Sequence, residues 1–482
     1  MGIKINEKES DDKKEIIDFL QSNFLGMGFK ELQDHVIYRE NCVLCGCCTT
    51  LCPRIGLADQ EPALIDYDPE CSTCFRYCPQ TYYPEELFEK ELFKENIKKS
   101  YPLGFYKQVL TAKSTNKEIL KVAQNGGVVS TLLIHALENK LIDGVLIIDR
   151  DDNWVPNPYI ARTKDEILAC AGSKYTVAPS LSIYKDAINE FKLEKLAFVG
   201  MPCQIQAVRK LQLYSPLSTE LGKFTLIIGL FCFSNYSYDL MSKFVQEDLG
   251  ILLTTVEKID ISNGRFYVYM KDGSIKDSPI KNTKKYNWVS CQHCKDYCAE
   301  GADISVGSVG TMENGWNSVI LRTDTGTSLF NDAIMAKKLV TSPEINLQKL
   351  EKEALRKKTR ITPIDEKTLE AMQILNISDF ETKTYTTLMS LGHVSDSILS
   401  KVMKTDKTLI QKSLGNLERL NWVVKTNEAY SCVNPTLVIN NEIHKLKMSL
   451  SERIEKLKSE ALPNLETIYA QNNHVKMDEK SD

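Results

Sequence analysis

Closely spaced cysteines constrain this chain more than any other feature of its sequence. The stretch CVLCGCCTTLCP places Cys42, Cys45, Cys48 and Cys52 at the spacing C-x2-C-x2-C-x3-C, followed by a proline. Three thiolates at this spacing wrap one iron–sulfur cubane, and the cysteine before the proline reaches a second cluster. A zinc ribbon or free thiols explain the spacing less well. Cys47 breaks the spacing, so we interpret it as a thiol beside the cluster that does not bind it.

A second run, DPECSTCFRYCP, supplies further cysteines and has Asp68 where its first cysteine would stand. Aligned on their Cys-Pro ends, the two runs resemble those of two-cluster ferredoxins. The resemblance implies that Cys42, Cys45, Cys48 and Cys78 hold one cluster, and that Cys52, Cys71 and Cys74 hold another. The second cluster would have Asp68 as an oxygen ligand or an open iron. A three-iron cluster, an empty site and a turn role for Asp68 before Pro69 are the alternatives.

The composition is that of a soluble globular protein. Of 482 residues, 43% are apolar and 26% are charged, and the formal net charge of −4 predicts no general attraction to nucleic acid or acidic lipid. The first residues, MGIKINEKESDDKKEI, lack the apolar core of a signal peptide. The longest apolar run, FTLIIGLFCF, is far shorter than the roughly 20 residues of a membrane span. The 15 cysteines therefore indicate metal binding in a cytoplasmic protein rather than disulfides.

The order of these patterns predicts three domains. Residues 36–100 hold eight of the cysteines and are expected to form a ferredoxin-like α+β domain. Residues 101–345 alternate strand-like runs such as LIDGVLIID and KLAFVG with helical segments, which predicts an α/β core. Residues 346–365 read as a charged linker helix. Residues 366–462 are expected to form a winged-helix domain with a C-terminal helix.

Two isolated cysteines stand at predicted strand ends, where sites collect in α/β sheets. Cys203 follows the strand of FVGMPCQIQAVRK, and Cys232 ends the strand of IIGLFCFSN. A lone buried cysteine is usually a small hydrophobic residue, but Cys203 lies at a strand-to-helix turn between Pro and Gln. Further along, SCQHCKDYC adds Cys291, Cys294 and Cys298.

Residues 101–345 resemble the family of β subunits of coenzyme F420 hydrogenases and dehydrogenases. The stretches that carry the resemblance, in order, are AQNGGVVSTLLIHALENKLIDGVLI, AGSKYTVAP, FVGMPCQIQAVRK, GLFCFSN and CQHCKDYCAEGADISVGSVG. The resemblance implies a cubane cluster held by Cys203, Cys232, Cys291 and Cys294. Cys298 falls where relatives often carry another residue, so it is expected not to bind, although local spacing alone would favour it.

The same resemblance implies bound FAD, in an FrhB-like flavin domain. No G-x-G-x-x-G fingerprint follows a strand, so spacing alone does not predict a dinucleotide site. Three loops are candidates for flavin contacts, since glycines allow close backbone approach and a helix N-terminus suits a pyrophosphate. Ordinary turns, a solvated lysine and a bulged strand are the plainer explanations. The candidate residues are Gln124, Asn125, Gly126, Gly127, Gly172, Ser173, Lys174, Tyr175, Gly307 and Ser308.

The resemblance implies an oxidoreductase with FAD and two to three 4Fe-4S clusters that moves electrons between coenzyme F420 and a redox partner. That partner would be a ferredoxin or a hydrogenase or dehydrogenase subunit. Flavin converts a hydride into single electrons, which clusters carry. No acid–base pair demands a catalytic role, and either direction of electron flow is compatible. A redox-sensing DNA-binding regulator and a flavin reductase for another small molecule are the alternatives.

Residues 371–435 read as a winged helix and resemble the TrmB type of archaeal regulators. Ser378 caps the first predicted helix, and a recognition helix over about 407–420 would expose Lys407, Gln411, Lys412, Asn416 and Arg419 to DNA. Protein docking is the alternative use. The next helix carries apolar residues at 3- and 4-residue steps and is expected to end at Pro463, before a disordered tail. It would form a homodimeric coiled coil or pack on the wing. The apolar residues are Ile443, Leu446, Leu450, Ile454 and Leu457.

Overall fold

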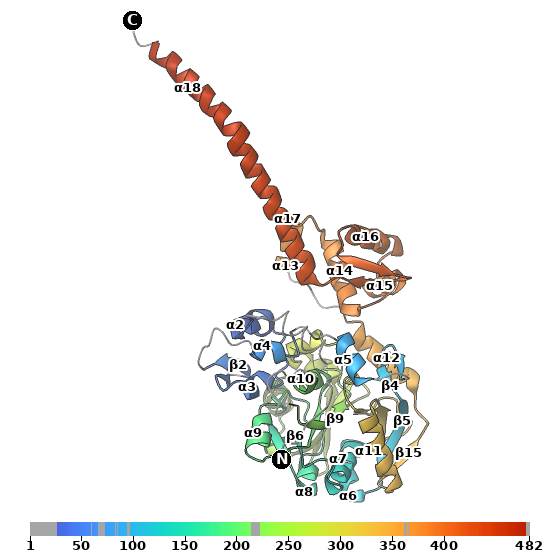
Figure 1. Cartoon of the computed structure of the whole chain (residues 1–482). Coiled ribbons are helices and arrows are strands. Elements are labelled where there is room, and N and C mark those ends of the chain that lie inside the picture. Colours follow the sequence, from blue (N-terminus) through green and yellow to red (C-terminus); the bar gives the residue numbers. More distant parts are fainter. Residues whose placement is uncertain are drawn as a thin grey trace, which may run out of the picture. The chain divides into compact units, whose positions relative to one another are not determined.

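The structure is a computed structural model that describes residues 27–58, 60–65, 73–81, 83, 85–93, 97–213, 222–360, 364 and 366–478. The chain divides into two units, residues 1–360 and 361–482, which we describe separately (Figure 1). The first unit therefore ends at residue 360, whereas the sequence places the end of the α/β domain at residue 345. Within the described residues, no helix is long and apolar enough to cross a membrane.

An eight-stranded mixed sheet forms the centre of the first unit (Figure 1). Strands β13, β9, β8 and β6 run parallel, and β5 joins them in the same direction because both β5 and β13 are antiparallel to β14. In sheet order the strands are β15 (Leu339–Ser342), β5 (Gln108–Ser114), β14 (Asn317–Leu321), β13 (Ile304–Gly307), β9 (Phe224–Leu230), β8 (Leu196–Gly200), β6 (Gly144–Arg150) and β7 (Pro156–Ala161). The predicted α/β core is confirmed.

Alternating side chains on the strands bury both faces of this sheet. On β6, Val145 and Ile147 join the apolar core of one face, whereas Leu146 joins that of the other. Helices α7 (Val128–Glu138), α8 (Lys164–Ala169) and α11 (Asp324–Met335) cover the first face, with the short α6 (Lys117–Val122) beside them. Helices α9 (Tyr184–Asn189) and α10 (Pro202–Leu213) cover the second face.

The N-terminal segment packs on the second face and shares its apolar core with α9 and α10. Its β1–β2 hairpin is antiparallel, and α3 contacts α4. The elements are α2 (Phe29–Leu32), π-helix η1 (Gln33–Ile37), α3 (Cys47–Leu51), β1 (Ile55–Ala58), β2 (Glu61–Leu64), α4 (Thr73–Tyr77) and α5 (Glu85–Leu92). Because the core is shared, the fold of this segment depends on the sheet beside it.

Smaller elements complete the first unit. A three-stranded antiparallel sheet packs with the π-helix η2 (Leu240–Asp248) around its own apolar core. The remaining elements are β3 (Lys98–Ser100), β4 (Gly104–Tyr106), η3 (Leu253–Thr255), β10 (Val256–Ser262), β11 (Arg265–Met270), β12 (Ile275–Pro279), η4 (Ile280–Tyr286), η5 (Val289–Gln292) and α12 (Leu347–Lys358). The predicted linker helix is α12, and it packs on the first unit because Leu350 and Ala354 are buried there.

The second unit begins as a winged helix. Ser378 caps α14 (Asp379–Leu391) and forms a capping box with Glu381, as the sequence predicts. Helices α15 (Asp396–Met403) and α16 (Lys407–Arg419) pack with α14, and the wing is the hairpin of β16 (Val423–Thr426) and β17 (Ala429–Cys432). Helix α13 (Glu366–Gln373) precedes them.

A long helical segment follows the wing and corrects one prediction. Helix α17 (Pro435–Lys456), the π-helix η6 (Leu457–Ala461) and α18 (Leu462–Asp478) follow one another without interruption, so the helix does not end at Pro463 (Figure 1). Proline breaks a helix interior by removing one amide donor and by clashing with the preceding turn. Here the wider turn of η6 ends at Ala461, and Pro463 is the second residue of α18, so it lies in the first turn of that helix. The prediction of a disordered tail is also wrong for residues 471–478, which are helical, while residues 479–482 lie outside the described residues.

Candidate functional site

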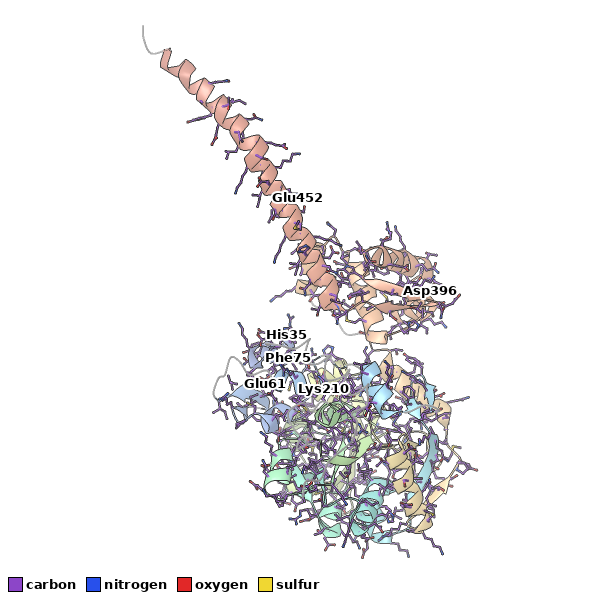
Figure 2. All side chains as sticks on the ribbon, in the orientation of Figure 1. His35, Glu61, Phe75, Lys210, Asp396 and Glu452 are labelled. Atoms are coloured by element: carbon purple, nitrogen blue, oxygen red, sulfur yellow. The ribbon has the colours of Figure 1, made fainter. Side chains whose placement is uncertain are left out.

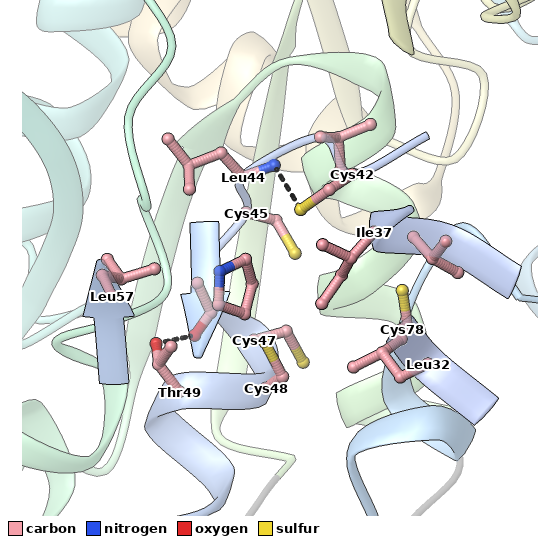
Figure 3. A pocket seen from close by; sticks show the side chains of 14 residues that line it. Leu32, Ile37, Cys42, Leu44, Cys45, Cys47, Cys48, Thr49, Leu57 and Cys78 are labelled. Carbon is pink, nitrogen blue, oxygen red and sulfur yellow. Dashed lines mark hydrogen bonds between the residues drawn. The ribbon is translucent and has the colours of Figure 1, made fainter. Parts of the chain in front are cut away.

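Five cysteines of the N-terminal segment line one cavity (Figure 3). Four of them are those that sequence reasoning assigns to the first cluster, namely Cys42, Cys45, Cys48 and Cys78, and the fifth is Cys47. Helix α3 carries Cys48, and Cys78 follows α4, so contact between these two helices closes the cavity. Apolar side chains such as Leu32, Ile37 and Leu57 form the rest of the wall.

The environment of these thiols suits a cationic cluster. Burial raises the pKa of Cys42 to about 12, and burial followed by the neighbouring thiols raises the pKa of Cys45 and Cys48 well above the ordinary value. Buried thiolates that lie close together are unfavourable on their own, and a bound cation stabilises their deprotonated form. The donor set therefore fits an iron–sulfur cluster, which supplies four irons.

The second N-terminal cluster cannot be assembled from the described residues. Asp68 and Cys71 lie outside them, so their predicted roles stay predictions. Cys52 follows α3, and Cys74 is buried in α4. Cys47 is fully buried in the wall of the first cavity and donates weakly from Sγ to the Tyr77 carbonyl at 3.7 Å.

A second set of four thiols gathers at the carboxyl ends of the parallel strands. Cys203 begins α10 after β8, Cys232 follows β9, and Cys291 and Cys294 lie in and after η5. The pKa of Cys203 is raised well above its ordinary value, first by burial and then by the thiols of Cys294, Cys232 and Cys291. The backbone N–H of Asn235 also donates to Cys291 Sγ at 3.3 Å.

Cys298 lies apart from this set. It is 1% exposed and packs with Leu103, Tyr106 and Ile320 in an apolar cluster. The Cys298 carbonyl accepts a hydrogen bond from Arg322 Nη2 at 3.2 Å. This position supports the expectation that Cys298 does not bind the cluster, against its local spacing.

Neither set has the geometry of a single-ion site. In the described parts of the chain, no three His, Cys, Asp or Glu side chains converge on one metal ion. A cubane makes a different demand, because each thiolate binds a separate iron at its own corner. Two sets of four thiols, rather than tightly converged ligands, are what such clusters need.

Residues that sequence reasoning missed connect the two sets. Trp288 Nε1 donates to the Cys42 carbonyl at 2.6 Å, and the Trp288 carbonyl accepts from Cys291 N at 3.0 Å. Trp288 thus makes hydrogen bonds to a cysteine of each set. Lys210, labelled in Figure 2, is fully buried and donates to the Cys78 carbonyl at 2.7 Å. The only sequence signal for Trp288 is its place three residues before Cys291.

The three predicted flavin loops meet at the same edge of the sheet. Gln124 Oε1 accepts from Ser173 N at 3.3 Å, which joins the first loop to the second. Asn317, which sequence reasoning missed, joins the first loop to the third: its Oδ1 accepts from Val128 N at 3.3 Å and its Nδ2 donates to the Gly307 carbonyl at 3.1 Å. Ser308 follows Gly307 in the third loop.

Glycines are required in the first loop, which also contains Asn125. A Cβ on Gly126 would lie 2.9 Å from the Ala112 carbonyl oxygen and from Asn317 N. Gly127 has a φ of +70° and is the N-cap of α7, whose N-terminal amides suit an anion. The loop geometry is thus set by backbone contacts that no other residue type allows.

Two residues of the second loop have structural contacts of their own. Lys174 is 9% exposed, and its Nζ donates to the carbonyls of Cys170, Ala171 and Gly172 at 2.5, 3.3 and 3.2 Å. Burial lowers the pKa of Lys174 to about 8. Tyr175 has a φ of +60° and packs against a separate apolar core. Lys174 therefore stabilises its own loop rather than presenting a solvated charge.

Comparison with known proteins assigns the family. The sequence matches the N-terminal and C-terminal regions of "Coenzyme F420 hydrogenase/dehydrogenase, beta subunit" at residues 109–185 and 193–346. The chain is 45% identical over 241 residues to the β subunit of the coenzyme F420 hydrogenase of Methanococcus voltae, covering 50% of this chain and 85% of that relative. The chain belongs to this family of β subunits.

Two further relatives extend the comparison. A subunit of the F(420)H(2) dehydrogenase of Methanosarcina mazei is 31% identical over 330 residues, which cover 65% of this chain and 88% of that relative. A solved structure of the F420-reducing [NiFe] hydrogenase complex from Methanosarcina barkeri contains a chain with 37% identity and a TM-score of 0.53, covering 57% of this chain and 94% of that one. Residues 372–437 match "Sugar-specific transcriptional regulator TrmB", as the sequence predicts.

The predicted recognition helix is α16, but acidic residues occupy part of its polar face. Lys407 Nζ lies 3.2 Å from Asp396 Oδ1, and Gln411 Nε2 donates to Asp396 Oδ2 at 2.6 Å (Asp396 is labelled in Figure 2). Asn416 donates to Glu381 Oε1 at 2.8 Å and is only partly exposed. Lys412 and Arg419 are exposed, as predicted.

Proposed function

We propose that this chain is an oxidoreductase that transfers electrons between coenzyme F420 and a redox protein partner through FAD and 4Fe-4S clusters. One observation carries the proposal: two sets of four thiols are joined by Trp288, and the three loops expected to bind flavin meet at the same sheet edge as one set. The membership in the family of β subunits supports coenzyme F420 as the hydride carrier.

Each part of this chain has a task in that reaction. Bound FAD would exchange a hydride with coenzyme F420 and pass electrons on singly. Gly126 and Gly127 would admit the cofactor to the N-terminus of α7. Cys203, Cys232, Cys291 and Cys294 would hold the nearest cluster, and Cys42, Cys45, Cys48 and Cys78 would hold the next. Cys52, Cys71 and Cys74 remain our proposed ligands for a third cluster.

The partner would exchange electrons with the N-terminal segment. This role suits a ferredoxin or another subunit of a hydrogenase or dehydrogenase, since the relatives named above include subunits of such enzymes. We propose no direction of flow, because positioning alone suffices for hydride transfer between stacked rings in either direction.

Anaerobic purification tests the proposal directly. We expect flavin together with about eight to twelve irons per chain, as two to three cubanes require. Adding reduced coenzyme F420 should bleach both flavin and cluster absorbance. Full cofactor content without a response to reduced coenzyme F420 would refute this substrate and favour a flavin reductase for another small molecule. Purified protein without flavin would refute the enzyme.

A redox-sensing DNA-binding regulator is the second candidate, and the match of residues 372–437 to TrmB favours it. This regulator would use α16 in the major groove. Affinity for duplex DNA should then differ between the oxidised and reduced protein, measured by fluorescence anisotropy at fixed salt. Equal affinity in both states would refute the redox-sensing role.

We also propose that the long helical segment pairs with a second copy of the chain. Its apolar residues repeat every 11 positions: Ile443, Ile454 and Leu465 form one series, and Leu446, Leu457 and Ile468 form another. All six are at least 40% exposed. An 11-residue repeat keeps a stripe facing one partner helix over several turns. Sedimentation of the full chain should give a dimer, and Leu457→Glu should give a monomer.

A further inference from the structure

Helix α12 brings positive charge to the second set of thiols, Cys203, Cys232, Cys291 and Cys294. The helix is anchored by Leu350 and Ala354, which are 0% and 1% exposed and pack with Tyr297 and Ile320. This anchoring fixes the orientation of the C-terminal turn of α12. The C-terminal of the two family matches ends at residue 346, one residue before α12 begins.

Lys357 on this last turn is buried against the thiols. It is 1% exposed, and its Nζ donates to the Cys232 carbonyl at 2.6 Å. The Cys294 and Cys232 sulfurs interact electrostatically with this ammonium.

Arg360 adds a second cation just after the helix. Its Nη1 donates to the Cys291 carbonyl at 2.6 Å, and its Nη2 donates to the Phe233 carbonyl at 3.1 Å. The guanidinium also lies 4.2 Å from the centroid of the Phe233 ring. Lys357 and Arg360 therefore bind the main chain of two cysteines from different parts of the set.

We propose that Lys357 and Arg360 form a cationic clamp that raises the reduction potential of a cluster held by Cys203, Cys232, Cys291 and Cys294. This inference rests on the proposed function, because it takes these cysteines as cluster ligands. A cluster that accepts one electron gains one negative charge. A fixed cation a few ångströms away stabilises that reduced state more than the oxidised state. The two residues are positioning residues and need not touch the substrate.

The chain offers a matched control on the same helix. Lys358 is the next residue and is also largely buried, but its Nζ binds Glu300 at 2.6 and 2.8 Å. Lys357→Met and Lys358→Met therefore remove the same charge at neighbouring positions, and only the first removes it from the thiols. Lys357→Arg keeps the charge and should keep the potential.

The test is a dithionite titration of the full chain, followed by EPR, with iron content measured for each variant. Lys357→Met should lower the equilibrium constant for one-electron reduction of one cluster at least about tenfold. This change corresponds to a reduction potential that is lower by about 59 mV. The other clusters should titrate as in the wild type, and Lys358→Met should shift none of them. An unchanged potential in Lys357→Met at full iron content would overturn the clamp.

Two other results are also decisive. If Lys357→Met loses iron, Arg360→Gln carries the same test, since it removes the second cation and leaves Lys357 in place. An unchanged potential in Arg360→Gln at full iron content then overturns the clamp. If the Cys203→Ser variant keeps the iron content of the wild type, the proposed function itself is refuted, and the clamp with it.

Discussion

The first set of thiols, in the N-terminal segment, and the second set, at the carboxyl ends of the parallel strands, each bring four thiols together. They do so by different means. Three cysteines of the first set come from one stretch, Cys42 to Cys48, and the cavity around them is mostly apolar. The second set takes Cys203 and Cys232 from two strand ends and two more cysteines from a distant turn. Its surroundings include the cations of Lys357 and Arg360. A local run thus brings three thiols together within a few residues, whereas every thiol of the dispersed set depends on the fold of the sheet or on the turn beside it.

The largest expected effect comes from replacing a proposed cluster ligand, Cys203, in comparison with Cys298, which is expected not to bind. Cys203→Ser should remove about four irons per chain, because a cubane lacking one of four thiolates is lost or degraded. Cys298→Ala should keep them, since Cys298 packs among apolar residues. The iron and sulfide contents of the two variants show which of the two cysteines binds the cluster. Iron loss in Cys298→Ala with retention in Cys203→Ser would reverse the assignment.

The dispersed set should also depend on the buried ion pair between α10 and the sheet. Arg209 Nη2 lies 2.9 Å from Asp303 Oδ1, and both residues are almost fully buried. Asp303→Asn leaves the guanidinium without its counter-charge, which should lower the free energy of unfolding by about 3–5 kcal/mol. Chemical denaturation of the first unit within the full chain measures this loss.

An exposed ion pair nearby serves as the control for that measurement. Glu194 is exposed and lies 2.8 Å from Lys223 Nζ, so Glu194→Gln should cost at most about 1 kcal/mol. Equal losses in Asp303→Asn and Glu194→Gln would show that the buried pair does not hold α10 on the sheet.

The contact between the two sets should have a smaller effect. Trp288→Phe removes the hydrogen bond to the Cys42 carbonyl, which is worth about 1 kcal/mol. Amide hydrogen exchange in residues 42–51 should rise about fivefold, as that free energy implies, while β9 keeps its protection. Trp154→Phe is the matched control, because its indole donates to Val256 at 3.3 Å, away from both sets. Faster exchange in both variants alike would argue against a specific role for Trp288.

The smallest expected effect concerns the winged helix. Asp396→Asn removes the negative charge beside Lys407 and Gln411, and an exposed pair of this kind is worth at most about 1 kcal/mol. If α16 binds DNA, affinity at low salt should rise about threefold to fivefold in this variant. Glu442→Gln, which removes a carboxylate paired with Lys445 on α17, should change nothing. An unchanged affinity in Asp396→Asn would place DNA on another face or exclude it.

Short-range patterns made several features predictable. The run Cys42 to Cys48 specifies three of the four thiols of the first set, because a turn and one short helix suffice to bring them together. The cap at Ser378 and the helices after it follow from local hydrogen bonding and apolar period. Pro463 was misjudged for a related reason: its effect depends on the width of the preceding turn, and the sequence pattern does not reveal a π-helix.

By itself, the sequence determined the α/β core, the winged helix and the family, and it predicted which thiols would hold clusters. Only the tertiary structure decided how these parts meet. Trp288, Asn317 and Lys357 carry no motif, because their contacts are with residues far away in the chain. The same holds for α12, whose charged sequence suggests a free linker. Its place on the core depends on the burial of Leu350 and Ala354 and on carbonyl groups that only the folded sheet presents.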